Sequence, residues 1–241
     1  MKEFNRYKYD VQGMPFNQID LPERIYKYRD WKNPCHKRML TNNEIYFAKP
    51  LDFKDNHELD FRLILDKSTP EIEEKTRQII DSKYSIFCVS KHKNNYTLWK
   101  TFANAQSGFC VGINSRKMFS NDEMVGGGGE VSYYHPVDIP TFTPPYEDDD
   151  LRRSCDFIRV IMSLPIRYES ENEYRVFKNS IKNPQAIISI ESIEEVILGH
   201  HISEDDEKEI IEICKSRLQL KRLCKAHYDY DLEYFSFTNL L

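Results

Sequence analysis

Tyr84-Ser85-Ile86-Phe87-Cys88-Val89-Ser90 is the strongest strand pattern in the first half of the chain, a short run rich in apolar and aromatic residues. The apolar residues between Tyr96 and Ala103 recur at helical spacing, and Gly108 is placed to end that helix. Phe109-Cys110-Val111-Gly112-Ile113 then returns as a buried strand. This order of strand, helix and strand predicts a mixed fold built on a sheet.

Shorter patterns extend this core in both directions. Further strands are expected at residues 25–29, 44–48, 131–134, 173–177, 193–198, 222–226 and 234–237. Helices are expected to begin at Pro70, with Thr69 as N-cap, to run from Leu151 to Leu164, and to run from Ser203 to about Leu218. The mixed order predicts a single α+β domain over residues 21–241, with a mainly antiparallel sheet and flanking helices.

Two segments have no such periodicity. Residues 1–20 are expected to form an N-terminal arm. Gly126 to Gly129 are four consecutive glycines without the Gly-Lys-Ser/Thr that would complete a phosphate loop. They predict a flexible loop.

Composition restricts the class of protein. Of 241 residues, 40% are hydrophobic and 30% charged, and no run approaches the roughly 20 apolar residues of a membrane helix. The N-terminus leads into no signal-peptide core, and six scattered cysteines without a C-x-x-C pair predict reduced thiols. A cytoplasmic protein is expected. The net charge of −5 argues against coating nucleic acid by bulk electrostatics, although a local basic groove is compatible with it.

Three glutamates alternate at the entry to the strand at 173–177. In an extended chain Glu169, Glu171 and Glu173 would share one face. Like charges roughly 7 Å apart repel one another, so that face is either wet or lies opposite cations or a ligand. A solvated edge strand explains the pattern, and so does an acid/base site built from paired carboxylates.

Five other residues carry chemistry that could serve such a site. Ser90 ends a buried strand, a usual location for a functional side chain. Lys27 and Tyr28 offer a cation and a ring to a phosphate- or ribose-bearing ligand. Trp99 and Phe102 would meet on one helix face, either as a ligand surface or as core. The spacing of histidines and cysteines matches no zinc motif, so no metal is expected.

Four segments together resemble the bacterial proteins catalogued as domain of unknown function 2971. They are residues 25–29, residues 45–55, the stretch from Phe87 to Ile113, and Glu171-Asn172-Glu173-Tyr174-Arg175. The likeness covers about residues 22–235. Where the family pattern reads Asn-Asp-Pro-Phe-Glu, this chain has Lys54-Asp55-Asn56-His57-Glu58, and the His-Tyr pair that usually follows the tryptophan is missing.

The layout also resembles the ADP-ribosyltransferases, which implies an ADP-ribosyltransferase-like fold. Those enzymes carry an Arg or His on a first strand, a Ser, Thr or Tyr at the end of a middle strand, and a Glu, often as Glu-x-Glu, on a late strand. Lys27, Ser90 and Glu171-Asn172-Glu173 stand at the matching positions. The resemblance implies that NAD is the substrate, with Glu173 as the catalytic carboxylate, Glu171 as its acceptor-side companion, Ser90 as a positioning residue, and Lys27, Tyr28, Trp99 and Asp55 as NAD contacts.

The leading hypothesis is an NAD-dependent bacterial effector, which transfers ADP-ribose to a protein or nucleic acid or hydrolyses NAD. The resemblance further implies a role as a toxin or in antiphage defence. One alternative is a non-enzymatic module for a nucleotide or a partner protein, in which the glutamates pair with cations such as Arg175. Another is a nuclease or phosphodiesterase with Asp55, Glu58 and the glutamates around magnesium.

Overall fold

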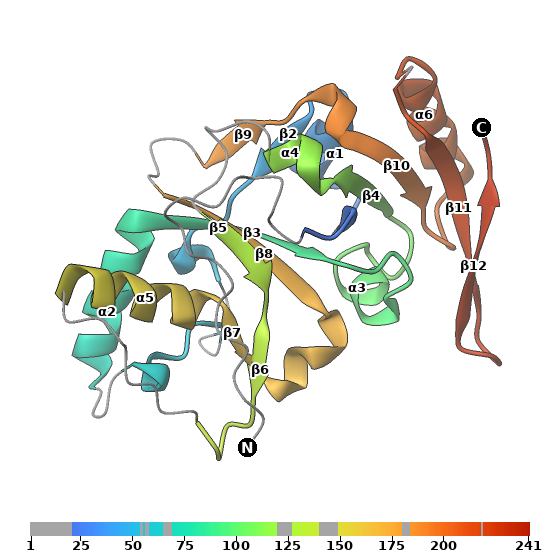
Figure 1. The fold of residues 1–241 in the computed structure, drawn as a ribbon. Coiled ribbons are helices and arrows are strands. Elements are labelled where there is room, and N and C mark those ends of the chain that lie inside the picture. Colours follow the sequence, from blue (N-terminus) through green and yellow to red (C-terminus); the bar gives the residue numbers. More distant parts are fainter. Residues whose placement is uncertain are drawn as a thin grey trace.

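An eight-stranded sheet runs through the molecule in the order β12-β11-β10-β4-β1-β3-β8-β5 (Figure 1). Its strands are β1 Arg24–Arg29, β3 Tyr84–Ser90, β4 Phe109–Asn114, β5 Gly127–Glu130, β8 Glu173–Asn179, β10 Ile193–Leu198, β11 Arg222–Asp229 and β12 Tyr234–Asn239. Only β10 and β11 pair in parallel within it. The computed structural model describes residues 21–53, 55, 58–64, 69–119, 127–139, 149–179, 184–217 and 219–241, so the expected arm at 1–20 lies outside the described residues.

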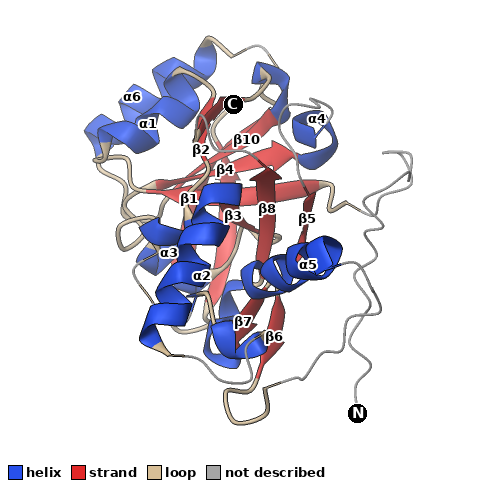
Figure 2. Cartoon of the chain, turned by 90° about the vertical axis from the view of Figure 1, so that its left-hand side faces the viewer, coloured by secondary structure: helices blue, strands red, loops and turns tan. Residues whose placement is uncertain are grey.

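Two small sheets and several helices surround the large sheet. β2 Glu44–Tyr46 pairs with β9 Gln185–Ile187, and β6 Ser132–Tyr134 pairs with β7 Ser163–Pro165. The helices are α1 Pro34–Thr41, α2 Pro70–Lys83, α3 Tyr96–Thr101, α4 Ser115–Phe119, α5 Asp149–Ile161 and α6 Glu204–Lys215. Short 3₁₀ helices are η2 Pro50–Asp52, η4 Phe61–Leu63, η6 Ile166–Glu171 and η7 Ile190–Ser192. Figure 2 shows α1 and α6 beside each other at one end of the molecule. The predicted α+β class with a mainly antiparallel sheet is confirmed.

The helix N-termini follow the capping signals of the sequence. Thr69 accepts a hydrogen bond from the Ile72 amide at 3.3 Å, and Pro70 occupies the first turn of α2. Ser203 caps α6 through the Asp206 amide at 3.3 Å. Among the described residues, no helix is long and apolar enough to cross a membrane.

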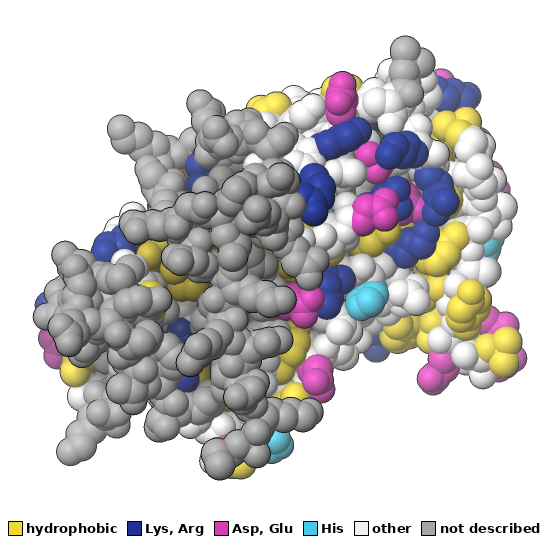
Figure 3. Space-filling view, viewed as in Figure 1, with side chains coloured by type: hydrophobic (Ala, Val, Ile, Leu, Met, Phe, Trp, Pro, Cys, Tyr) yellow, Lys and Arg dark blue, Asp and Glu magenta, His cyan; other side chains and the backbone are white. Residues whose placement is uncertain are grey.

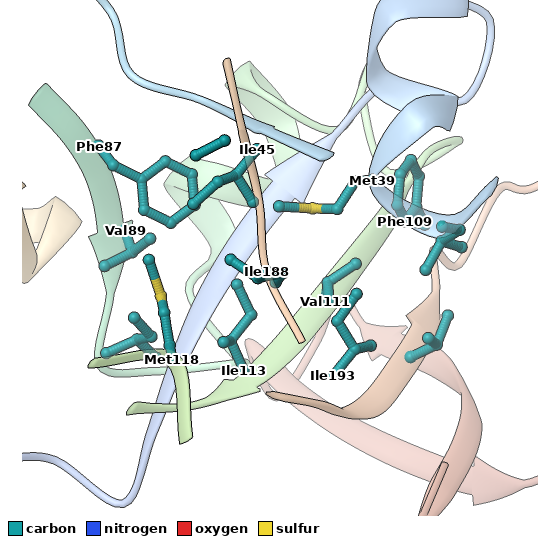
Figure 4. Packing of buried hydrophobic residues seen from close by; sticks show 14 of the residues in the cluster. Met39, Ile45, Phe87, Val89, Phe109, Val111, Ile113, Met118, Ile188 and Ile193 are labelled. Carbon is teal, nitrogen blue, oxygen red and sulfur yellow. The ribbon is translucent and has the colours of Figure 1, made fainter. Parts of the chain in front are cut away.

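Apolar side chains pack on both faces of the sheet. Figure 4 shows the larger cluster, to which three strands contribute Phe87, Val111 and Ile193. A second cluster on the opposite face joins Tyr26 and Trp99 to residues of β10, β11 and β12. Charged side chains are spread unevenly over the surface, and Figure 3 shows lysines and arginines gathered over β4, β10 and β11.

The glycine run forms part of the sheet, which corrects the expectation of a flexible loop. Gly127 to Glu130 make the edge strand β5, paired with β8, while Gly126 lies outside the described residues. A Cβ on Gly127 would lie 2.4 Å from Phe177 Cζ, and one on Gly128 would lie 3.0 Å from the Arg175 carbonyl oxygen. Glycine is needed because β5 approaches β8 too closely for a side chain.

The prediction that Glu169, Glu171 and Glu173 share one face of an extended strand is also wrong. Residues 166–171 form the 3₁₀ helix η6, so only Glu173 belongs to β8. Asn172 joins the two elements in the left-handed conformation, with φ 46° and ψ 52°. Glu169 therefore lies exposed on the short helix, while Glu171 and Glu173 flank the turn.

Candidate functional site

A cavity of about 670 Å³ opens where β1 and β3 part. The two strands share a single residue pair, Tyr26 with Ser90, and residues of both strands line the space beyond it. β8, η6, α1 and the segment between β2 and η4 complete the walls. Because β1, β3 and β8 are neighbours in the sheet, the structure brings Lys27, Ser90 and Glu173 to one place.

One end of the cavity is acidic. Glu171, Glu173, Glu58 and Asp55 all line it. Burial, together with repulsion from the Glu173 and Glu58 carboxylates, raises the pKa of Glu171 to about 7. Burial also raises the pKa of Glu58. A carboxyl group that titrates near neutral pH can both accept and release a proton under ordinary conditions.

Glu173 is held by Arg175 two residues along the same strand face. Arg175 Nε lies 2.9 Å from Glu173 Oε1, and Nη2 lies 3.2 Å from Oε2, a two-pronged pair between buried groups. The same guanidinium donates to the Ile161 carbonyl oxygen at 2.6 Å and lies 3.6 Å from Glu58. Both oxygens of Glu173 are thus fixed in position, which leaves Glu171 as the more adaptable carboxylate of the two.

The turn before β8 places Glu171 in the cavity. Ser90 Oγ donates to the Glu171 carbonyl oxygen at 3.0 Å and lies 3.4 Å from that of Asn172. Ser90 is completely buried, and its register partner across the sheet is Glu173. Its hydroxyl therefore holds the backbone that carries the two glutamates, which agrees with a positioning role.

Lys27 lies across the cavity from these carboxylates. Its ammonium donates to the Cys88 carbonyl oxygen and lies over the Phe87 ring, 5.2 Å from the centroid. Burial and repulsion from Arg29 lower the pKa of Lys27 to about 7, in spite of the attraction of Glu173 and Glu171. Lys27 and Glu171 therefore titrate in the same range of pH within one cavity.

Arginine side chains from β1 and α1 also line the cavity. Arg29 follows Lys27 on the same face of β1 and, within the described ranges, forms no ion pair with a carboxylate. Burial lowers its pKa to about 10, so it stays charged at neutral pH. Arg38 also lines this end, paired with Glu44 at 3.1 Å, beside His36. Arg29 was not predicted as a site residue, although its spacing of two from Lys27 on a strand predicts that both side chains lie on the same face.

Two of the predicted NAD contacts, Tyr28 and Trp99, pack against other residues of the protein. Tyr28 borders the cavity, but its ring packs edge-on against Trp99 at 5.1 Å and its hydroxyl donates to the His92 carbonyl oxygen. Trp99 has no exposed surface, donates from Nε1 to the Lys93 carbonyl oxygen at 2.9 Å and does not line the cavity. We therefore assign Trp99 to the core, a correction of the predicted ligand contact.

The remaining predicted contact, Asp55, lies at the rim. It accepts hydrogen bonds from the Tyr168 hydroxyl and, at 2.9 Å, from Arg167. Rings of Tyr46, Phe53, Phe102 and Tyr168 also line the cavity, so flat aromatic surfaces are available near the carboxylates. Over the part of the chain that the structure describes, no group of three or more His, Cys, Asp or Glu side chains is arranged to hold a metal ion.

Comparisons with known proteins leave the site to be interpreted from its own chemistry. No family model, curated protein or solved structure matches the chain.

Proposed function

We propose that this protein is an enzyme that cleaves the nicotinamide–ribose bond of NAD and passes ADP-ribose to an acceptor or to water. The observation that carries the proposal is one cavity that combines a carboxyl group with a pKa of about 7, Glu171, with an arginine free of carboxylate partners in the described chain, Arg29. The first suits proton transfer and the second suits a phosphate.

The cavity has the size and lining for a dinucleotide. Ligand pockets commonly measure about 300–1,000 Å³ and combine apolar walls with a few charged groups. Arg29 and Lys27 would bind the pyrophosphate, since a guanidinium matches phosphate oxygens in pairs. The exposed rings of Tyr46 and Phe102 line the cavity and offer faces on which nicotinamide or adenine can stack, whereas guanidinium groups already lie over the rings of Phe53 and Tyr168.

The carboxylates suit the electrostatics of the reaction. As the bond from C1′ to the nicotinamide nitrogen breaks, its electron pair leaves with neutral nicotinamide and positive charge develops on the ribose. Glu173, oriented by Arg175, and ionised Glu171 stabilise that charge. Glu171 then takes the proton of the attacking water or acceptor hydroxyl as the new C1′–oxygen bond forms. This distribution of roles makes Glu171 the base on the acceptor side and Glu173 the carboxylate that stabilises the ribose charge, which is also the assignment that the resemblance implies.

Nicotinamide release from NAD tests the proposal, measured with and without a bacterial lysate as a source of acceptors. Glu171→Gln is expected to lower kcat at least 100-fold, the usual range for loss of a general base. Glu169→Gln is the matched control, because Glu169 lies two residues away on the same short helix and is exposed. It should stay within twofold of the wild type.

Three results decide between the hypotheses. Absence of both nicotinamide release and label transfer from NAD, with folded protein and lysate present, would reject the enzyme. NAD binding without turnover would favour the non-enzymatic nucleotide-binding alternative, in which the Glu173–Arg175 pair is purely structural. Equal losses in Glu171→Gln and Glu169→Gln would show that Glu171 has no special role.

A further inference from the structure

β10 carries two consecutive glutamates that are both buried, Glu194 with no exposed surface and Glu195 with 2% exposed. Consecutive residues of a regular strand face opposite sides, but the register between β10 and β4 shifts between Ile193 and Glu195. Glu194 bonds to Arg24 and Glu195 to Tyr26, which are two residues apart on β1. The bulge therefore places both carboxylates on one face of the sheet.

The backbone opposite the bulge makes room for them. Gly112 is the β4 partner of Glu195, and a Cβ at Gly112 would lie 3.0 Å from both Glu195 Cβ and Tyr26 Cε1. Tyr26 donates its hydroxyl to Glu195 Oε2 at 3.3 Å. Burial and the Glu195 charge raise the pKa of Tyr26 to about 12, so it remains a donor at neutral pH.

Cations cover both carboxylates. Lys221 Nζ and Lys117 Nζ lie 2.8 and 3.2 Å from Glu194, and Arg24 lies 3.4 Å away. On Glu195, Lys93 lies 2.9 Å and Arg222 3.4 Å away. These five cations define what we call the basic face, and Figure 3 shows lysines and arginines gathered over its strands, β4 and β10, and toward β11.

The outer ends of the basic face remain in contact with water. The side chains of Lys221, Arg222 and Lys117 are 58%, 53% and 41% exposed. In the described chain, Arg24, Lys93, Lys221 and Arg222 form ion pairs with three carboxylates, those of Glu194, Glu195 and the exposed Glu23, which lies 3.2 Å from Arg24. These four cations alone outnumber the carboxylates that they contact, although the chain as a whole carries −5.

The buried glutamates fix the cations before any partner arrives. Each cation is tethered to a carboxylate that cannot move, so little side-chain entropy remains to be lost on binding. Such preorganisation is useful for a polyanion, whose phosphates can replace water at the exposed ends of the side chains.

An aromatic ring adjoins these charges. Lys93 Nζ lies 4.6 Å from the centroid of Phe237 on β12, and Phe237 is partly exposed. α3 covers the neighbouring part of this face through Trp99, which packs near Phe235. A half-open sheet face with fixed cations and an aromatic ring fits the requirements of single-stranded nucleic acid, which needs backbone charges and a stacking surface.

We propose that the basic face binds single-stranded nucleic acid, with Lys117, Lys221 and Arg222 on successive phosphates and Phe237 against a base. The proposal is independent of the reaction at the cavity, because binding is measured without NAD.

The test is fluorescence anisotropy with a labelled oligouridylate over a series of salt concentrations. The triple variant Lys117→Gln, Lys221→Gln, Arg222→Gln should bind at least tenfold more weakly. Because each phosphate contact on a single strand contributes about 0.7 to the slope of log K against log salt, the slope should fall by about 2. Glu194 keeps Arg24 and Glu195 keeps Lys93, so folding should survive, as a thermal melt can verify.

A second triple variant controls for net charge. Lys75, Lys208 and Lys215 are exposed lysines on α2 and α6, and their change to Gln should leave affinity within twofold. Equal loss in both triple variants, or no binding by the wild type at low salt, would overturn the proposal. So would an affinity for duplex DNA or for poly-glutamate as high as that for the oligouridylate.

Discussion

Lys27 and Glu171 face one cavity with pKa values that both lie at about 7, one lowered and one raised. Each value has burial as its first cause, and burial disfavours the charged form of either group. The attraction between the two charges offsets burial only in small part for either group. Because both groups titrate near pH 7, activity should be sensitive to pH near neutrality.

The pH profile of NAD cleavage should therefore be bell-shaped around pH 7. Activity rises as Glu171 loses its proton and falls at higher pH as Lys27 loses its charge. Lys27→Arg keeps a cation at all accessible pH values, so the alkaline limb should disappear while the acidic limb stays. The measurement is kcat/KM for nicotinamide release between pH 5.5 and 9.

A surface variant controls for the replacement of lysine by arginine itself. Lys91 pairs with Glu130 at 2.7 Å and does not line the cavity, so Lys91→Arg should leave both limbs unchanged. An alkaline limb that persists in Lys27→Arg, with the variant folded, would show that Lys27 is not the group that titrates.

The junction between η6 and β8 is the element that turns two glutamates toward the cavity. Asn172 adopts a left-handed conformation there, and the Ser90 hydroxyl binds the carbonyl oxygens on either side of the turn. A left-handed residue costs roughly 1–2 kcal/mol for most side chains, less for asparagine and least for glycine. The left-handed backbone at position 172 therefore explains why asparagine is found there.

Asn172→Val should destabilise the protein by about 1–2 kcal/mol, because a β-branched residue is poorly tolerated at positive φ. It should also lower activity, since the turn positions Glu171. Asn172→Gly is the matched variant and should keep both stability and activity close to the wild type. Urea denaturation and nicotinamide release measure the two effects. Equal stability of the Val and Gly variants would contradict the role assigned to the turn.

The periodicity of apolar residues predicted the regular helices and strands well, but it predicted the irregular segments between them poorly. Tyr84–Ser90, Phe109–Asn114 and Ile193–Leu198 are apolar runs, and each is a strand in the structure. The same rules failed at η6, since alternating charge does not reveal a left-handed residue. They failed at β5 because glycine has little strand propensity, and Gly127, Gly128 and Gly129 pair with β8, which lies far away in the sequence.

The candidate site was predictable in part. Lys27, Ser90, Glu171 and Glu173 were named from the sequence, and the structure places all four at one cavity. The contacts that hold these side chains were not predictable. Arg175 fixes Glu173, and the separation of β1 from β3 leaves Arg29 lining the cavity, and neither follows from the spacing of residues along the chain.

At the scale of the whole molecule, glutamates gather in pairs at two separate places: Glu171 and Glu173 at the cavity, and Glu194 and Glu195 at the bulge of β10. The effect of ionisation on stability has opposite signs for Glu171 and Glu194. At the cavity, desolvation dominates and raises the pKa of Glu171, so ionisation there reduces stability. At the bulge, burial opposes ionisation of Glu194, but hydrogen bonds from Lys221, Lys117 and Asn114 outweigh it and lower the pKa to about 2.

Glu194 should therefore stabilise the fold at neutral pH and lose this effect in acid. The unfolded chain has a glutamate pKa of about 4.3, so the stabilisation is fully present above that value and declines as the pH falls toward 2. Glu194→Gln keeps the shape of the side chain but leaves Arg24, Lys117 and Lys221 repelling one another. At pH 7 the variant should be less stable by about 2 kcal/mol, a value that allows for screening of the half-exposed lysines.

Urea denaturation at pH 7 and pH 3 provides the measurement. Less than half of the difference between wild type and Glu194→Gln should remain at pH 3. At that pH the unfolded wild-type chain is stabilised by protonation of Glu194, whereas the folded protein keeps the group largely ionised. Glu212→Gln is the control, since Glu212 pairs with Lys215 on an exposed helix surface and should contribute less than about 0.5 kcal/mol at either pH. A loss in Glu194→Gln that is equal at both pH values would mean that the side chain acts by packing rather than by charge, and the ion-pair account of the bulge would then fail.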